Sequence, residues 1–229
     1  MNVAALMPVK GFRNAKQRLS SVLSSDAREL LAETMFCDVL RQVRIARGLV
    51  AVFVVTGDEK VAAIAAAAGA QVIREAEETG ETSAVDFARW QLKRAGFEAV
   101  LIIPADMPLV RALDIEEVLA HVPEGAKAPY ALLVPSHDRL GTNALLLAPP
   151  DVIKLGFGYD SFNFHMGQVM AQDLPARYME NLHIALDIDE PKDLELFLSY
   201  GSEHGKSARV ARTLLTEQDA PVTRRSRTI

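Results

Sequence analysis

LVAVFVVTGDEKVAAIAAAAGAQVIRE, residues 49–75, is the segment from which the expected fold follows. It opens with a continuous apolar, β-branched run over 49–57, which is typical of a strand covered on both faces of a sheet. The alanine-rich run over 60–69 predicts a helix that stops at Gly69, because alanine favours helix and glycine commonly follows a helix end. Residues 70–75 predict a shorter strand. This strand–helix–strand unit indicates a parallel sheet.

The alternation of strands and helices continues on both sides of this unit. We expect further strands over 2–9, 99–106, 130–136 and 142–149, and helices over 24–47, 83–96, 114–122, 161–172 and 191–201. Residues 180–189 are expected to begin extended. The fold class is therefore α/β, with a mostly parallel sheet and helices on both faces. We predict a single domain over 1–201 and a polar, flexible C-terminal tail over 202–229, although ARVARTLLTE (208–217) could hold two helical turns.

The charge and composition of the chain limit the kinds of molecule that it is expected to bind. The chain has 229 residues and a formal net charge of −5, which argues against general binding to nucleic acid or to an acidic membrane. The basic RRSR segment (224–227) is interpreted as a solvated end. Cys37 is the only cysteine, so a disulfide within the chain and a cysteine-based metal cage are excluded. Pro8 and Lys10 interrupt the first apolar segment, and this absence of a signal-peptide pattern predicts a cytoplasmic protein.

A basic segment, PVKGFRNAKQRL (8–19), directly follows the first expected strand. Its cations Lys10, Arg13, Lys16 and Arg18 would lie at the carboxyl edge of the sheet, where ligands bind in such folds. There they could neutralise phosphate oxygens. An exposed basic loop explains the same pattern. Neither a Walker loop nor a G-x-G-x-x-G string is present.

Three carboxylates follow two other expected strand ends. Asp106 lies in IIPADMPLV (102–110), and Asp187 and Asp189 lie in LDIDEP (186–191). Converging carboxylates repel one another unless a cation lies between them, and Mg²⁺ prefers such oxygen ligands together with substrate phosphates. Asp189 could instead cap the helix that follows it, since a proline stands near the first helical turn.

The segments GTN (141–143) and GYDSFNFH (158–165) form a candidate anion pocket. A glycine with free N–H groups and Ser161 at a helix N-terminus suit an anion. Asp160 or Ser161 can also simply cap that helix. We interpret His165 as a hydrogen-bonding or packing residue rather than a metal ligand, because no second histidine stands four residues on.

Five motifs in this order, PVKGFRNAKQRL, PADMPLV, GTNALLLAPP, FGYDSFNFH and LDIDEPKDL, resemble the 2-phospho-L-lactate guanylyltransferase family. The resemblance covers about residues 3–199 and implies the nucleotidyltransferase (GT-A-like) variant of the Rossmann-like α/β/α sandwich. It also implies transfer of GMP from GTP to a phosphorylated three-carbon acid with release of pyrophosphate, in coenzyme F420 biosynthesis. Family members use 2-phospho-L-lactate, phosphoenolpyruvate or 3-phospho-D-glycerate, and a downstream F420 transferase is the implied partner. A homodimer is left open.

The resemblance also implies roles for individual residues. The residues implied for catalysis are Lys10, Lys16, Arg18 and Asp106, with the three cations on the triphosphate. Those implied for Mg²⁺ are Asp106, Asp187 and Asp189. Those implied for the acid are Thr142, Gly158 and Ser161, and those for the nucleotide are Gly80, Thr82, Ser83 and Pro104.

One stretch departs from the family pattern. GETSAVDFA (80–88) stands where many members carry G-L-N-x-A, which places Thr82 where asparagine would be. Two other functions are weighed. A sugar-phosphate or molybdopterin nucleotidyltransferase is disfavoured because the L-x-G-G-x-x-x-R-M-G loop is absent. A noncatalytic nucleotide-binding module of the same fold is disfavoured because all three aspartates are present.

Overall fold

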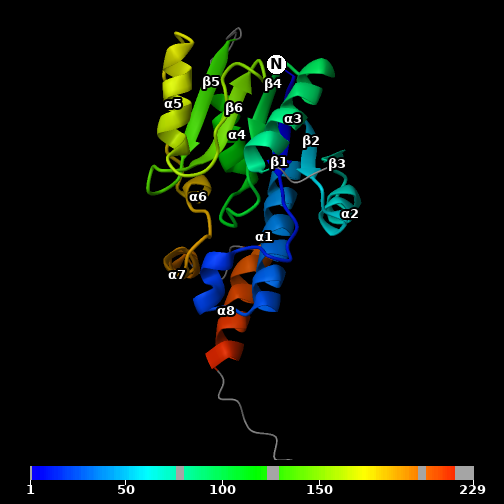
Figure 1. The fold of residues 1–229 in the computed structure, drawn as a ribbon, viewed down its shortest axis with the longest axis vertical. Helices are drawn as coiled ribbons and strands as arrows, with labels where there is room; N and C mark the ends of the chain where they lie inside the picture. Colours follow the sequence, from blue (N-terminus) through cyan, green and yellow to red (C-terminus); the bar gives the residue numbers. More distant parts are fainter. Residues whose placement is uncertain (1, 76–79, 123–128, 201–204, 220–229) are drawn as a thin grey trace, which may run out of the picture.

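The chain forms a six-stranded sheet, which lies in the upper part of the view in Figure 1, with α7 (Pro191–Ser199) and α8 (Gly205–Asp219) below it. The computed structural model describes residues 2–75, 80–122, 129–200 and 205–219. The strands are β1 (Val3–Pro8), β2 (Leu49–Thr56), β3 (Gln71–Arg74), β4 (Ala99–Ile102), β5 (Tyr130–Pro135) and β6 (Thr142–Ala148). Their order across the sheet is β3-β2-β1-β4-β6-β5.

Five of these strands run in one direction, and β6 runs in the other. β1 pairs in parallel with β2 and β4, and β2 pairs in parallel with β3. β6 is antiparallel to both of its neighbours, β4 and β5. Only residues 136–141 separate β5 from β6, which is too short for the crossover that a parallel pair needs. The prediction of a mostly parallel sheet is confirmed.

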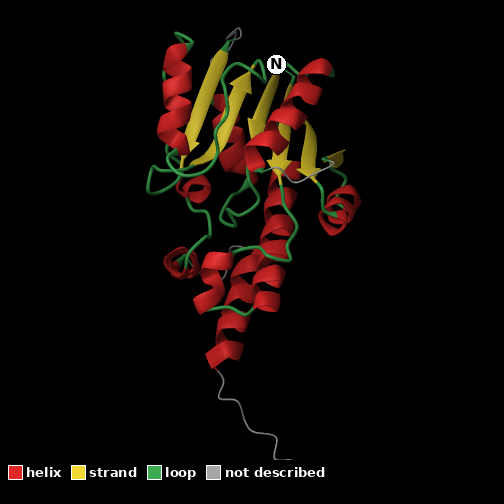
Figure 2. Cartoon of the chain, viewed as in Figure 1, coloured by secondary structure: helices red, strands yellow, loops and turns green. Residues whose placement is uncertain are grey.

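Helices cover both faces of the sheet (Figure 2). They are α1 (Ser25–Ile45), α2 (Glu59–Ala67), α3 (Glu81–Arg94), α4 (Ala112–Ala120), α5 (Ser161–Ala171), α6 (Leu182–Ala185), α7 (Pro191–Ser199) and α8 (Gly205–Asp219), with a 3-10 helix η1 (Gln17–Ser21). Apolar residues of α1, α2 and α4 join one core cluster, and those of α3 and α5 join the cluster on the opposite face. The chain is thus an α/β/α sandwich.

Two element boundaries differ from the sequence expectation, each for a local reason. β4 ends at Ile102 rather than at 106, because Pro104 has no N–H to continue the ladder. Residues 182–185 form the short helix α6 within a segment expected to begin extended. The side chain of Asn181 accepts the N–H groups of His183 and Ile184 and so caps that helix.

The C-terminal segment differs most from the expectation. A flexible tail was predicted from residue 202, but Gly205–Asp219 forms α8, which packs against α1 and α7 (Figure 1). Its buried side chains join a third apolar cluster with η1, α1 and α7. The buried carboxylate of Asp38 accepts the N–H and hydroxyl of Ser207 at the start of α8, both at 2.8 Å. Residues 220–229 lie outside the described part of the chain.

No helix in the described ranges combines the length and apolarity that crossing a membrane requires.

The sheet brings several loops together at one of its edges. β1 and β4 are parallel neighbours, so the segments that follow them, 9–16 and 103–110, emerge at the same edge. The backbone N–H of Ile188 donates to the carbonyl of Asp106 at 3.0 Å, which brings the 186–190 segment to that edge as well.

Candidate active site

Two cavities adjoin at the carboxyl edge of the parallel strands. The first has a volume of about 730 Å³ and lies over the loop after β1, the end of β2 and the start of α3. The second, about 700 Å³, lies over the 136–143 hairpin, the 157–161 segment and the 187–193 segment. The residues that line both are Arg18, Glu81, Pro104, Asp106 and Asp189. Groups bound in the two cavities would therefore meet beside these side chains.

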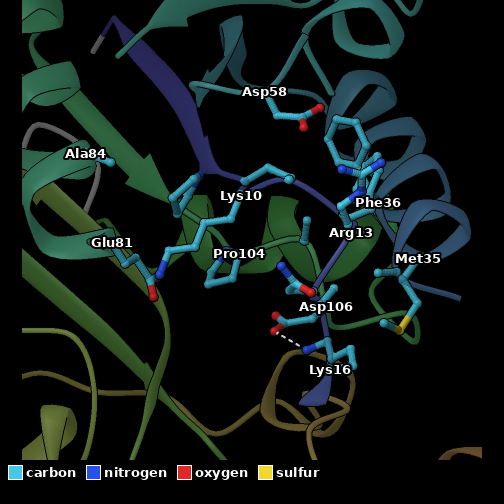
Figure 3. A pocket seen from close by; sticks show the side chains of 18 of the residues that line it. Lys10, Arg13, Lys16, Met35, Phe36, Asp58, Glu81, Ala84, Pro104 and Asp106 are labelled. Atoms are coloured by element: carbon cyan, nitrogen blue, oxygen red, sulfur yellow. Dashed lines mark hydrogen bonds and ion pairs between the residues drawn. The ribbon is translucent and has the colours of Figure 1, made fainter. Parts of the chain in front are cut away.

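Lys16 is the best-anchored cation of the first cavity. Its ammonium contacts Asp106 Oδ2 at 2.7 Å (Figure 3) and Asp189 Oδ1 at 2.9 Å. Only 10% of its side chain is exposed. Its backbone has φ 53°, a left-handed conformation, at the N-cap position of η1. Burial alone would lower the pKa of Lys16, but the two carboxylates outweigh it and raise the pKa above the usual range. Lys16 is therefore charged.

Lys10, Arg13 and Arg18 also line the first cavity. Figure 3 shows Lys10 reaching across it toward Glu81. Arg18 is 69% exposed and lies 3.7 Å from an oxygen of Asp189, at the boundary between the cavities. The predicted group of cations thus surrounds one cavity, which an unpatterned basic loop would not do.

Asp189 faces the site rather than capping α7. The N-cap of α7 is Glu190, whose N–H donates to Asp193 Oδ2 at 2.7 Å. The Asp189 side chain pairs with Lys16 and Arg18, which hold the pKa of its carboxyl below the usual range despite its burial. The alternative that Asp189 serves as the helix cap is therefore wrong.

Asp187 lies nearby and is held from the side of β6. Asn143 donates to Asp187 Oδ1 at 2.9 Å and also contacts the carbonyl oxygens of Ile184 and Ala185 at 2.9 and 3.1 Å. Burial, followed by the negative charge of Asp106, raises the pKa of Asp187 to about 6. Asn143 is a site residue that sequence reasoning missed, although it lay within the quoted GTN motif.

The carboxylates by themselves do not form a complete set of ligands for a magnesium ion. In the residues that the structure describes, no group of three His, Cys, Asp or Glu side chains is arranged to hold a metal ion. Asp106 and Asp189 nevertheless share one cation, the ammonium of Lys16. Two carboxylates with substrate phosphates are a common donor set for Mg²⁺. The donor chemistry therefore suits Mg²⁺ bound together with a nucleotide.

Thr142 and Ser161 lie together in the wall of the second cavity. The N–H of Thr142 donates to Ser161 Oγ at 3.0 Å, and both residues are buried. Gly158 lines the same wall with φ 122°, a conformation that favours glycine. Asp160 occupies the N-cap position of α5 but its side chain makes no capping hydrogen bond to the helix. The structure thus brings the three residues predicted for the acid to one wall.

The four residues predicted to bind the nucleotide do not all lie at a cavity wall. Pro104 lines both cavities, whereas Gly80, Thr82 and Ser83 are not among the lining residues of either. Thr82 Oγ1 instead accepts the N–H of Phe157 at 3.0 Å, which ties α3 to the second cavity's wall. Their role in nucleotide binding stays a prediction.

Glu81 is the residue of α3 that does line both cavities, and it does not stand among the residues predicted for the site from the sequence. Burial, followed by the charge of Asp106, raises the pKa of Glu81 to about 7. Nothing in the sequence pattern distinguishes Glu81 from the other acidic first-turn residues. Its significance depends on where the start of α3 lies.

Comparison with known proteins gives relatives over most of the chain. A phosphoenolpyruvate guanylyltransferase from Rubrobacter xylanophilus is 37% identical over 194 residues, covering 85% of this chain and 92% of the relative. A 3-phospho-D-glycerate guanylyltransferase from Colwellia psychrerythraea is 35% identical over 196 residues, covering 86% and 91%. A 2-phospho-L-lactate guanylyltransferase from Methanothermobacter thermautotrophicus is 30% identical over 201 residues, covering 88% and 86%.

Solved structures agree on the fold. A protein from Desulfovibrio desulfuricans, assigned as a nucleotide-diphospho-sugar transferase, superposes with a TM-score of 0.75 at 16% identity, covering 95% of this chain and 98% of its own. A cytidylyltransferase from Leptospira borgpetersenii superposes with a TM-score of 0.61 at 13% identity, covering 95% of both chains. At such low identity these likenesses establish the fold alone.

The model of one protein family, described as "Guanylyl transferase CofC like", matches residues 3–219. This match includes both cavities and extends through α8, beyond the end of the domain expected from the sequence. With the family model spanning nearly the whole described chain, and with relatives above 30% identity over most of their length, the chain belongs to the family of CofC-like guanylyl transferases.

Proposed function

We propose that this protein transfers GMP from GTP to a phosphorylated three-carbon acid and releases pyrophosphate, as a step in coenzyme F420 biosynthesis. The observation that carries the proposal is the pair of adjoining cavities, one bordered by cations and the other by hydroxyl groups, that meet at Asp106 and Asp189. This arrangement suits two substrates that react through phosphate groups. The names of the three relatives, each a guanylyltransferase for a different phosphorylated acid, support it.

The first cavity suits the triphosphate of GTP. Lys10, Arg13, Lys16 and Arg18 line it, and cations placed around a transferring phosphoryl group stabilise the charge that spreads over its oxygens. Lys16 already lies between Asp106 and Asp189. A bound nucleotide would offer phosphate oxygens that compete with these carboxylates for its ammonium.

The second cavity suits the acid. Thr142 and Ser161 carry hydroxyl groups, and Gly158 leaves its backbone open beside them. An oxygen of the acid's phosphate would attack the α-phosphorus of GTP, and the bond from that phosphorus to the oxygen bridging to the β-phosphate would break. Pyrophosphate leaves with that oxygen. The attacking phosphate is already anionic, so the reaction requires positioning and charge neutralisation rather than a general base.

Asp106 and Asp189 are the residues that would hold Mg²⁺, with Asp187 beside them. When bound, the ion neutralises phosphate charge and orients the reacting oxygens. The protein's own contribution is to place these carboxylates at the junction of the cavities, through the 106–188 backbone contact and through Asn143.

The test is pyrophosphate release from GTP and Mg²⁺ with each of 2-phospho-L-lactate, phosphoenolpyruvate and 3-phospho-D-glycerate, with the product identified by mass. We expect release with one acid well above the others, and little with ATP or CTP in place of GTP. The product joins the acid to GMP through a diphosphate, which an F420 transferase would then consume. GTP binding without release for any acid would instead favour a noncatalytic nucleotide-binding module.

A further inference from the structure

His165 is fully buried behind the wall of the second cavity. It lies on the second turn of α5, and both of its ring nitrogens have partners. Nδ1 lies 2.9 Å from the hydroxyl oxygen of Thr142, and Nε2 lies 3.1 Å from the backbone nitrogen of Gly156. The rings of Phe157 and Phe164 pack against the imidazole edge to face, with centroids 5.2 and 5.6 Å away.

These partners determine which nitrogen carries the proton. A backbone N–H can only donate, so Nε2 must accept from Gly156 and cannot carry a hydrogen. In the neutral ring the hydrogen is then on Nδ1, and it is donated to Thr142 Oγ1. Burial, with the positive charge of Arg89, lowers the pKa of His165 to about 4, so the ring is neutral at ordinary pH.

The direction of the neighbouring hydrogen bonds also determines where the two hydroxyl groups of the cavity wall can donate. Thr142 Oγ1 accepts from His165, so the Thr142 hydroxyl hydrogen is not used in that bond. Ser161 Oγ accepts the N–H of Thr142, so the Ser161 hydroxyl hydrogen is also not used there. Within the described residues neither hydroxyl has a hydrogen-bond acceptor. Both line the second cavity, so each can donate into it.

We propose that His165 is a positioning residue that presets the Thr142 hydroxyl, beside that of Ser161, as a hydrogen-bond donor to an anionic oxygen of the phosphorylated acid. The inference rests on the proposed function, and it assigns a role to the imidazole of His165, which does not itself contact a substrate. With the opposite tautomer, bare Nδ1 would accept the Thr142 hydrogen and remove that donor from the cavity. Loss of one hydrogen bond to a charged acceptor predicts a rise in the KM for the acid of about 10- to 100-fold.

Two substitutions separate this role from simple packing. In His165→Asn the amide nitrogen replaces Nδ1 as donor to Thr142, whereas in His165→Gln the longer side chain reaches toward Gly156 and its amide oxygen replaces Nε2. We expect His165→Asn to keep a KM for the acid within about threefold of wild type, and His165→Gln to show the full rise. The KM for GTP should change little in either variant.

The matched control is the same pair of substitutions at His121, which is exposed at the end of α4 and lines neither cavity. These should leave both KM values unchanged. Thr142→Val should raise the KM for the acid at least as much as His165→Gln does, and the double variant should be no worse than Thr142→Val alone, because His165 acts only through the Thr142 hydroxyl. Additive effects would overturn the inference.

A readout without turnover is the ¹⁵N spectrum of histidine-labelled wild-type protein, with the His165 signals assigned by their loss in His165→Gln. A protonated Nδ1 and a bare Nε2 are expected, and the reverse assignment overturns the inference. Pyrophosphate release by wild type with equal acid KM values in His165→Asn and His165→Gln refutes the positioning role alone. No release with any of the three acids refutes the proposed function, and the positioning role with it.

Discussion

Replacing Glu81 with glutamine tests whether the ionised Glu81 carboxylate, buried between the two cavities, lowers the stability of the folded protein. Glu81 is one of the residues common to both cavities, and burial together with Asp106 raises the pKa of its carboxyl to about 7. An ordinary glutamate in the unfolded chain has a pKa of about 4.5. The folded protein therefore binds this proton more tightly than the unfolded chain does.

The sign of the effect follows from proton linkage. Below the unfolded pKa both states are protonated, so the group has no effect on folding. As pH rises from about 4.5 to about 7 the unfolded chain releases the proton first, and stability falls. Above the folded pKa the loss is constant. The difference between about 7 and 4.5, at about 1.4 kcal/mol per pKa unit, is about 3 kcal/mol.

Glutamine cannot ionise, so Glu81→Gln should recover most of this loss. We expect the variant to be more stable than wild type by about 3 kcal/mol near pH 8 and by only about 1 kcal/mol near pH 5. Urea denaturation of the nucleotide-free protein at the two pH values measures the difference. The matched control is Glu59→Gln, an 87% exposed first-turn residue of α2, which should change stability by less than about 0.5 kcal/mol at both. A Glu81→Gln effect that is equal at the two pH values would refute the reasoning.

Three further substitutions test other contacts. Lys16→Met leaves Asp106 and Asp189 without their shared cation. Because these carboxylates are 31% and 43% exposed, the free energy of unfolding in urea should fall by only about 1–2 kcal/mol, and turnover should be lost. Asp106→Asn should lower the rate of pyrophosphate release by about 100-fold or more with an unchanged circular dichroism spectrum, and wild-type turnover would remove Asp106 from the site. Asp38→Asn weakens the contacts to Ser207 and should destabilise the protein by about 2 kcal/mol in urea, whereas an unchanged unfolding midpoint would show that α8 does not depend on them.

Local patterns in the sequence were sufficient for the sheet and most of its helices. The continuous β-branched run of β2 and the alanine run of α2 each satisfy one strong local preference, and their bounds agree with the expectation within two residues. Gly69 has φ 79° just after α2, as expected of a glycine that ends a helix. Such features depend on neighbours along the chain, so they can be predicted without knowing the tertiary structure.

For the C-terminal helix α8, the sequence indicated at most two helical turns over 208–217 within a flexible tail. Its residues are mostly polar, and only a few small or apolar side chains, including Ala208, Ala211 and Leu214, face α1 and α7. Its start also depends on Asp38, 169 positions earlier in the chain. A helix of this composition is stabilised by the surface that it meets rather than by its own sequence.

The sequence by itself determined the strand–helix alternation, the cations after β1 and the presence of Asp106 after β4, because these follow from periodicity and local spacing. Asp187 and Asp189 follow the short helix α6 rather than the strand end expected for them, so their place beside Asp106 depends on the tertiary structure. Only the tertiary structure decided that β6 lies between β4 and β5 in the sheet and that one lysine joins Asp106 to Asp189. It also decided which hydroxyls of the second cavity can donate. The physical reason is that charge pairing, burial and hydrogen-bond direction depend on distances between atoms, and residues far apart in sequence acquire those distances only when the chain folds.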